Sequence, residues 1–315
     1  MQLTRLARYA VLALILTFGL AAWPADSPTP AQAPNATVPF QIYVGLLNAQ
    51  QVNVYKPGRS GPGKVLLDGL TNITGGIAVD KLQNVYVTTG GGWVVMYPSY
   101  GVVPMLRYQF LDKHQPPLTA GITVDQAGTL YAALYGDGIV AEYTAADPTH
   151  SSFTVAPPPP YTPLAVAVDR QNNLYMEYAL VGPFPQTAYI EKCPPQSNQC
   201  TDLGVQLGAG GWNLAFDGQG NVVACDELAA TIDVFPPNGG QPRVISQGLN
   251  GCGYFALDSS NNYLVVANES HNWGPTSISI FDYASGALMQ NITAGVPQND
   301  FLSGLALSVS TTAVP

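Results

Sequence analysis

The sequence predicts an all-β protein, a six-bladed β-propeller with four-stranded blades. Two observations lead to this prediction: a short motif recurs along the chain, and each repeat holds four short strand-like runs. The motif GIAVDKLQNVYV (76–87) returns as GITVDQAGTLYA, AVAVDRQNNLYM, NLAFDGQGNVVA and FALDSSNNYLVV. Its aspartates are 45, 44, 48 and 41 residues apart, at Asp80, Asp125, Asp169, Asp217 and Asp258. Periods of this length are typical of propellers, solenoids and other repeat arrays.

The content of each repeat favours the propeller over the other arrays. Around Asp217 the runs WNLAF, VVAC, TIDVF and RVISQ are rich in apolar residues and are separated by Gly, Pro or Asn. Short apolar runs with this punctuation are typical of strands joined by turns. Four strands in a repeat of 41 to 48 residues make one propeller blade.

The repeated aspartate begins a turn of the form DxxGN. Its carboxylate can accept backbone N–H groups within the turn, and Gly or Asn at the fourth place tolerates the left-handed conformation that closes it. DKLQN, with Gln83 at that place, is the weakest match. Because local backbone needs explain one residue type at the same place in every repeat, we expect these aspartates to be structural rather than catalytic.

The two ends of the repeat region predict how the ring closes. GLALS (304–308) matches the motif, with Ser308 in place of the aspartate. Near the N-terminus QIYVG, VNVYK and KVLLD read as second, third and fourth strands with no first strand before them. We therefore expect residues 303–309 to supply the innermost strand of the blade that begins at residue 40, which leaves no open sheet edge between the first and last blades and makes six blades.

The repeat resembles that of the NHL-type six-bladed propellers, whose unit runs roughly as apolar–Asp–x–x–Gly–Asn–apolar–Tyr–apolar–Ala–Asp. The resemblance covers residues 40–309 and is carried best by GIAVDKLQNVYV and NLAFDGQGNVVACD. Only Asp226 retains the second aspartate, and the Asn-Arg pair usual after it is missing. Other residues occupy that place in the remaining blades: Thr89, Leu134, Tyr178 and Ala267. The resemblance therefore implies the architecture and little of the family's surface chemistry.

The N-terminal segment predicts export from the cytoplasm. Arg5 and Arg8 precede an apolar run over 10–20 and then small residues, which is the pattern of a secretory signal peptide over residues 1–22. Residues 23–39 read as a flexible leader rich in Pro and Ala, 40–309 as the propeller and 310–315 as a tail. We therefore expect a secreted, periplasmic or extracellular protein.

The charge of the chain argues against polyanionic partners. Charged residues are only 10% of the sequence and the formal net charge is −9. Cleavage of the signal peptide removes two arginines and no acid, so the mature charge becomes −11. Nucleic acids and anionic membranes need clustered Lys and Arg. We therefore expect no nucleic-acid partner. We also expect no membrane span after cleavage, because no other segment is long and apolar enough, and we expect a monomer.

The four cysteines fit an oxidising compartment. Cys193 and Cys200 bracket a short loop, while Cys225 and Cys252 lie on either side of a repeat boundary. A zinc site is the competing interpretation, but no CxxC pair or neighbouring histidine supports it. We predict two disulfides, Cys193–Cys200 and Cys225–Cys252.

The candidate binding residues lie on one face of the predicted propeller. In this fold the loops between second and third strands share a face with the segments that lead into the inner strands, and here these loops hold the distinctive residues. The rings suit stacking on a sugar or peptide, and the polar groups suit hydrogen bonding. The alternative is that the aromatic residues pack between blades. The candidates are Trp93, Tyr135, Tyr178, Trp212, Asp226, Glu227, Glu269, His271 and Trp273.

Two functions from different classes follow. The first is a secreted module, with no cofactor, that binds a small molecule, a glycan or a protein through its loop-rich face. The alternative is a calcium-dependent, lactonase-like hydrolase or lyase with its site at the central channel, where hard oxygen ligands suit Ca²⁺. Its donors would be Glu177, Asp226, Asn268 and Glu269. No GxSxG, HExxH or phosphate-loop motif is present. His271 fits a solvated loop histidine better than a catalytic base. The sequence leaves open whether the protein is an enzyme.

Overall fold

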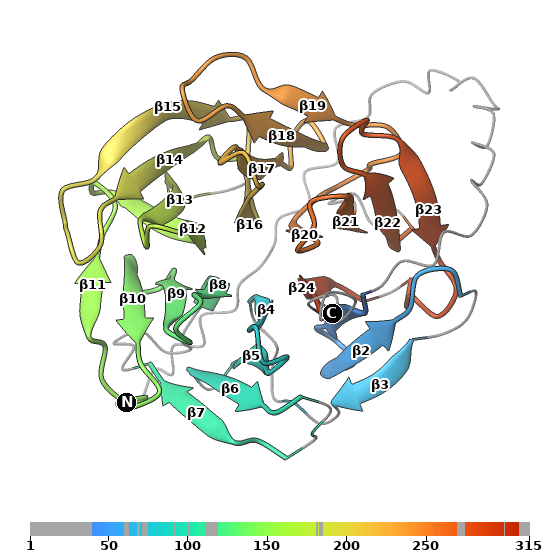
Figure 1. Ribbon diagram of the computed structural model, residues 1–315, viewed down its shortest axis with the longest axis horizontal. Helices are drawn as coiled ribbons and strands as arrows, with labels where there is room; N and C mark the ends of the chain where they lie inside the picture. The colour runs from blue at the N-terminus through green and yellow to red at the C-terminus, as the bar shows by residue number, and fades with distance from the viewer. Residues whose placement is uncertain are drawn as a thin grey trace, which may run out of the picture. The chain divides into compact units, whose positions relative to one another are not determined.

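The computed structural model describes residues 40–308 except for 60–62, 68–69, 71–74, 91, 100, 102, 111–118, 181, 183–184, 270–274 and 299. The expected signal peptide (1–22), leader (23–39) and tail (310–315) lie outside the described residues. The described chain forms six antiparallel sheets of four strands each, arranged around a ring (Figure 1), and it contains no α-helix. The predicted six-bladed propeller is confirmed.

Each blade begins with an inner strand beside the central axis. Five of these strands open their blades in chain order, and the sixth is the last strand of the chain. The inner strands of blades 1 to 6 are β24 (Leu302–Leu307), β4 (Ile77–Val79), β8 (Thr119–Val124), β12 (Tyr161–Val168), β16 (Gly210–Phe216) and β20 (Tyr254–Leu257).

The other strands follow outward in each blade. Their second strands are β1 (Ile42–Leu46), β5 (Val85–Thr89), β9 (Leu130–Leu134), β13 (Leu174–Leu180), β17 (Val222–Asp226) and β21 (Tyr263–Asn268). Their third strands are β2 (Gln51–Tyr55), β6 (Trp93–Tyr97), β10 (Ile139–Tyr143), β14 (Ala188–Cys193), β18 (Thr231–Phe235) and β22 (Ser277–Asp282). Their outer strands are β3 (Lys64–Leu67), β7 (Leu106–Gln109), β11 (Phe153–Val155), β15 (Thr201–Leu207), β19 (Arg243–Ile245) and β23 (Leu288–Ile292).

The ring closes by pairing of the chain ends, as predicted. Strand β24 is antiparallel to β1, with Ile42 opposite Leu307 and Leu46 opposite Leu302. Ser308, which replaces the aspartate, accepts a hydrogen bond on its Oγ from the Gln41 N–H at 2.7 Å, and its own N–H donates to the Gln41 carbonyl at 2.9 Å. The inner edge of β1 is therefore covered.

The five aspartate turns are local hydrogen-bonded units. In each, the carboxylate accepts the N–H groups two and four residues further along the chain. At Asp217 the donors are Gln219 and Asn221, both 2.9 Å from Oδ1, and the Asn221 amide donates to Oδ2 at 2.7 Å. The fourth residue of each turn has a positive φ: Gln83 (67°), Gly128 (87°), Asn172 (60°), Gly220 (81°) and Asn261 (56°). The structural interpretation of these aspartates is confirmed.

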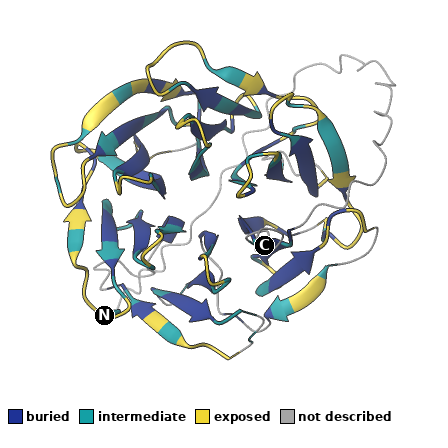
Figure 2. Cartoon of the chain, in the orientation of Figure 1, coloured by how far each residue is buried: buried dark blue, intermediate teal, exposed yellow. Residues whose placement is uncertain are grey.

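The hydrophobic core is divided among the blade interfaces. Six buried clusters occur, and each is built from two neighbouring blades. Figure 2 shows that the second strands are mostly buried and that exposed positions occur on the outer strands. Because alternate side chains of a strand point to opposite faces, each blade contributes to the cluster before it and to the cluster after it. No blade has a core of its own.

The propeller has two faces with different connections. The turn face carries the five aspartate turns and the connections between third and outer strands. The loop face carries the connections between second and third strands and the segments that lead into the inner strands. Both predicted disulfides are present. Cys193–Cys200 spans the connection between β14 and β15 on the turn face, and Cys225–Cys252 joins blades 5 and 6 towards the loop face.

We predict that deletion of residues 302–315 abolishes cooperative unfolding, because it removes β24 and exposes both the edge of β1 and the cluster between blades 6 and 1. Thermal unfolding followed by circular dichroism tests this, with deletion of 310–315 as the control that keeps β24. A chain lacking 302–315 that unfolds in one transition at the wild-type temperature would contradict the closure.

We predict that Asp217→Ala lowers the free energy of unfolding by about 0.5–2 kcal/mol, by analogy with loss of a side-chain cap. The carboxylate holds its own turn and also accepts the Tyr283 hydroxyl of blade 6 at 3.0 Å. Urea unfolding gives the value, and Asp217→Asn, which keeps one acceptor oxygen, should lose less. Ligand binding on the loop face should not change, and its loss in a folded variant would show a functional aspartate.

Candidate functional site

The inner strand of blade 5 narrows the central channel. Between Gly210, opposite Asp226, and Leu214, opposite Ala224, strand β16 has three residues where β17 has one. This bulge contains Trp212, whose N–H donates to the Gly253 carbonyl of blade 6 at 2.8 Å. Two extra residues in one strand move its backbone out of the ladder, here towards the centre of the ring.

The same bulge reaches blade 3. A Cβ added to Gly121 of β8 would stand 2.5 Å from the Trp212 carbonyl oxygen and 3.0 Å from the Ala165 Cα, so only glycine allows this approach. The Asn213 amide, next to Trp212, donates to the Phe255 carbonyl at 2.9 Å. Blades 3, 5 and 6 therefore meet at one level of the channel.

On the turn face the channel widens into a cavity of about 710 Å³. Asn213 of the bulge lines this cavity. The two or three residues directly before each aspartate turn supply much of the cavity wall. Blades 1 to 3 contribute mainly apolar residues, such as Ile77, Ile122 and Leu305. Blades 4 to 6 add polar ones, such as Gln171. None of the described candidate residues lines this cavity.

On the other side of the bulge, Glu177 is a charged-type residue inside an apolar interface. It lies in the middle of β13, opposite Ala165 and Ile190, and is fully buried. Its carboxyl group lies against Gly210 of blade 5, where a Cβ would overlap Oε1. Within the described chain, neither carboxyl oxygen accepts a hydrogen bond. Glu177 thus occupies the interface between blades 4 and 5, with the Gly211 N–H as a nearby polar group.

The surroundings of Glu177 favour its neutral form. Burial raises the pKa of the Glu177 carboxyl well above its usual range, and the negative charges of Glu227 and Asp226 raise it further. The nearby Gly211 N–H opposes this shift in part. The influence of Glu227 also shows that acids of blades 4 and 5 lie near each other on this side of the bulge.

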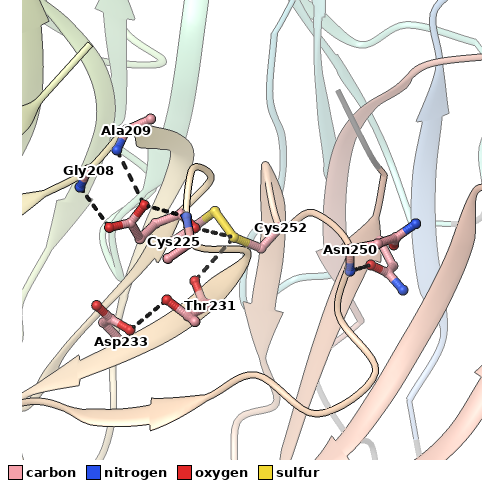
Figure 3. Close-up of a disulfide and its surroundings, with 10 residues drawn as sticks. Gly208, Ala209, Cys225, Thr231, Asp233, Asn250 and Cys252 are labelled. Carbon is pink, nitrogen blue, oxygen red and sulfur yellow. Dashed lines mark hydrogen bonds between the residues drawn. A yellow bond between two sulfur atoms is a disulfide. The ribbon is translucent and has the colours of Figure 1, made fainter. Parts of the chain in front are cut away.

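The disulfide of blade 5 occupies the same place in its blade as Glu177 does in blade 4. Glu177 follows Asp169 by eight residues, and Cys225 follows Asp217 by eight. Cys225 crosses to Cys252 of blade 6, with Cα atoms 5.7 Å apart (Figure 3). Each of these side chains reaches from a second strand to the segment before the next inner strand. At this position blade 5 is joined to blade 6 by a disulfide, whereas blade 4 places a carboxyl group against blade 5.

Glu227 and Glu269 continue this series of acids around the ring. Glu269 of blade 6 accepts the Leu302 N–H of β24 on Oε2 at 2.8 Å. Glu227 of blade 5 is buried, and its Oε1 would be 2.7 Å from a Cβ at Gly253. Burial raises the pKa of Tyr254, and the charges of Glu227 and then Glu269 raise it further. Glu227, Tyr254 and Glu269 therefore form one acidic group beside the inner strands of blades 6 and 1.

Asp226 has a structural role distinct from that of Glu227. Its carboxylate accepts the N–H groups of Gly208 (2.6 Å) and Ala229 (3.0 Å) and so holds the connections on both sides of it. In blade 6 the equivalent residue is Asn268, whose Oδ1 accepts the Asn250 N–H at 2.8 Å. In both pairs donor and acceptor are 18 residues apart.

The alignment that puts Ala267 at the place of Asp226 is therefore wrong by one residue. The N–H of Asp258 donates to Tyr263, five residues on, where those of the other motif aspartates donate to the residue four further on. This longer turn shifts the second strand of blade 6, so Asn268 takes the place of Asp226 and Glu269 that of Glu227.

The described aromatic candidates pack against the blade interfaces. Tyr178 is buried between blades 3 and 4, where its hydroxyl donates to Glu191 at 3.2 Å and its ring stacks on Tyr189 with centroids 5.8 Å apart. Tyr135 and Trp212 are partly exposed and contact both the blade 3–4 and blade 4–5 clusters. Trp93 contacts the cluster between blades 1 and 2. Of these, Trp212 lies beside Glu227, because a Cβ on Gly253 would be 3.2 Å from Trp212 Cδ1 and 2.7 Å from Glu227 Oε1.

His271 and Trp273 lie outside the described residues. Within the described chain no group of three or more His, Cys, Asp or Glu side chains is arranged to hold a metal ion. A signal for Glu177 is its position as the one acid in LYMEYAL, an otherwise uncharged second strand.

We predict that Glu177→Gln stabilises the protein increasingly as the pH rises above the usual carboxyl range. The folded protein keeps the proton that the unfolded chain loses, so wild-type stability falls with pH in this window, by at most about 1.4 kcal/mol per pH unit for one group. The variant lacks this loss. Urea unfolding from pH 4 to pH 8 measures it, and parallel profiles for both proteins would contradict a neutral buried Glu177.

Within the described chain no helix is long and apolar enough to cross a membrane. No protein-family model matches the sequence, and no curated protein matches it. Among solved structures, the chain is similar to a protein of unknown function from Bacteroides caccae, with a TM-score of 0.61 and 11% sequence identity. The similarity covers 86% of this chain and 99% of that one. At this identity the similarity supports the propeller fold and carries no function.

Proposed function

We propose that the protein is a secreted, NHL-like propeller that binds a ligand on its loop face, around Glu227, Tyr254 and Glu269. The ligand is a small molecule, a glycan or a protein segment that presents hydroxyl or ammonium groups. The five aspartate turns, with their shared hydrogen bonds, support the relation to NHL-type repeats. The two disulfides support an oxidising compartment.

The observation that carries this proposal is that the described loop face holds acids and no described Lys or Arg, whereas the turn face holds both acids and cations. Every described Lys and Arg lies in the half of the ring nearest the turn face: Lys56, Arg59, Lys64, Lys81, Arg107, Arg170, Lys192 and Arg243. The described loop face carries acids instead, at Asp137, Asp226, Glu227, Glu269 and Asp300. A site lined by carboxylates favours groups that donate hydrogen bonds or carry positive charge.

The acids differ in how far they are already engaged. Asp226 caps Gly208 and Ala229, and Asp300 accepts the N–H groups of Asn48 and Ala49 at 2.6 and 2.9 Å. Each of these carboxylates accepts hydrogen bonds from two backbone N–H groups and so holds the local backbone. Glu269 accepts the Leu302 N–H on Oε2, and a carboxylate has about four acceptor sites in all. Trp212 adds a partly exposed ring beside Glu227.

The alternative is a calcium-dependent, lactonase-like hydrolase or lyase that uses the same end of the channel. Its donors would be Glu177, Asp226, Asn268 and Glu269, which lie on or directly after the second strands of three successive blades, since Ca²⁺ takes oxygen ligands. The binding module is preferred, since the described residues hold no preformed group of three metal-binding side chains.

A glycan array and a panel of amines, followed by calorimetry of the hits, test the proposal. Glu227→Gln and Glu269→Gln should each weaken binding about ten- to hundredfold, since a hydrogen bond to a charged group contributes about 1.5–3 kcal/mol. Glu142→Gln is the control, because Glu142 lies on the turn face and pairs with Gln196. Equal affinity of all three variants would contradict the loop-face site. Tight Ca²⁺ binding that is lost in Glu269→Gln would favour the hydrolase or lyase.

A further inference from the structure

The positive charge of the turn face is concentrated on two blades. Five of the eight described Lys and Arg residues lie in blades 1 and 2, and all five are exposed: Lys56, Arg59, Lys64, Lys81 and Arg107. The connection between β2 and β3, the Asp80 turn and the first residues of β7 bring them to the same face. In a chain with a net charge of −9, this is a local reversal of sign.

Acids scarcely offset these cations. Between residues 40 and 110 the sequence has two acids, Asp68 and Asp80, and Asp68 lies outside the described residues. Asp80 is buried, and its carboxylate accepts the Leu82 and Asn84 N–H groups at 2.9 and 2.8 Å. Its charge is therefore held inside the turn by N–H dipoles. The surface of blades 1 and 2 on the turn face is basic.

The most exposed large hydrophobic residues occur in the same place. In the described chain these are Val103 (71% exposed), Leu82 (67%) and Met105 (66%), and Val65 on β3 adds a fourth at 44%. Leu82 is in the Asp80 turn, and Val103 and Met105 are in the connection between β6 and β7. All of them lie on the turn face of blades 1 and 2.

Backbone hydrogen bonds hold these tips in place. The Leu82 N–H donates to the Asp80 carboxylate at 2.9 Å. In the β6–β7 connection the Gly101 N–H donates to the Pro98 carbonyl at 2.8 Å, and the Met105 N–H donates to the Met96 carbonyl at 2.9 Å. The aliphatic side chains therefore stand on bonded turns, and ordering them costs little when a partner binds.

We propose that the turn face of blades 1 and 2 docks onto an anionic lipid bilayer, with Leu82, Val103 and Met105 inserted at the interface and the surrounding cations on the headgroups. Separate protruding aliphatic tips suit a soft hydrocarbon phase, since they form no continuous flat surface for a protein partner. Basic residues around them add attraction to anionic lipid. The acidic remainder of the chain opposes docking little, because exposed charges are screened beyond about 10 Å at 0.1 M salt.

This proposal is independent of the loop-face site and goes beyond it. Docking through the turn face leaves the loop face directed away from the lipid, so a bound propeller still presents its loop face to solvent. It also corrects an argument from total charge. The negative net charge of the chain argues against binding to anionic membranes, whereas the cluster of cations on the turn face of blades 1 and 2 favours such binding there.

Co-sedimentation with vesicles tests the docking surface, using equal parts phosphatidylglycerol and phosphatidylcholine against phosphatidylcholine alone. We expect binding to the anionic vesicles at low salt and little binding to the neutral ones. Lys56→Gln, Lys64→Gln and Lys81→Gln together should weaken partitioning about a hundredfold, at about fivefold for each cation. Leu82→Ser, Val103→Ser and Met105→Ser together should weaken it about tenfold or more.

Two matched controls keep the test specific. Arg170→Gln removes an exposed cation from the turn face of blade 4, and Leu228→Ser removes a 58% exposed leucine from the loop face. Both should bind vesicles like the wild type, and thermal unfolding of every variant establishes that it is folded. The proposal is overturned if the wild type does not bind anionic vesicles, or if the controls lose as much binding as the blade 1–2 variants. It is also overturned if light scattering shows dimers that the blade 1–2 variants abolish.

Discussion

The antiparallel pairing of β24 with β1 is the interaction on which the rest of the structure depends. It joins residues that are 267 positions apart in the chain, as in the bond from Gln41 to Ser308. The hydrophobic core is divided among interfaces between neighbouring blades, so an open ring would lose one whole interface. That interface includes Ile42, Val44, Leu302 and Leu305, all buried. The candidate residues on the loop face lie on or next to the strands of this closed ring.

The order of the strands also decides on which face each charged side chain lies. Strand direction alternates within a blade, so a residue near the start of an outer strand and one near the end of a third strand lie on the same face. Lys64 and Lys192 are examples, and both lie towards the turn face. Glu227 and Glu269, which follow second strands, lie at the other face. Two chemically different surfaces therefore arise from the order of strands, and the two proposals assign a soluble ligand to one and lipid to the other.

Much of the fold could be predicted because it depends on local interactions. An aspartate turn is complete within about five residues, so its repetition reveals the number of blades and the positions of their strands. The disulfides followed from strand direction, since Cys225 ends a second strand and Cys252 precedes an inner one. The site was less accessible to prediction. The bulge at Trp212 depends on Gly121 and Gly253 of other blades, and the burial of Glu177 depends on the glycines of blade 5. The shift from Ala267 to Asn268 came from one added residue in a turn rich in Ser and Asn, where the motif has no unique register.

The bulge in β16 limits how the protein can change by rearrangement of its repeats. A ring of equivalent blades tolerates, in principle, the exchange, duplication or loss of a blade, because each unit contacts only its neighbours. Here the Trp212 carbonyl meets Gly121 of a blade that is not its neighbour. A copy of blade 5 placed so that it faced blade 4, 5 or 6 would meet a side chain at this position (Ala165, Asn213 or Tyr254), and a ring with one more or one fewer blade would separate Trp212 from Gly121. Blades 3 and 5 are thereby tied to fixed positions, and an array of similar units has become a molecule with a defined order.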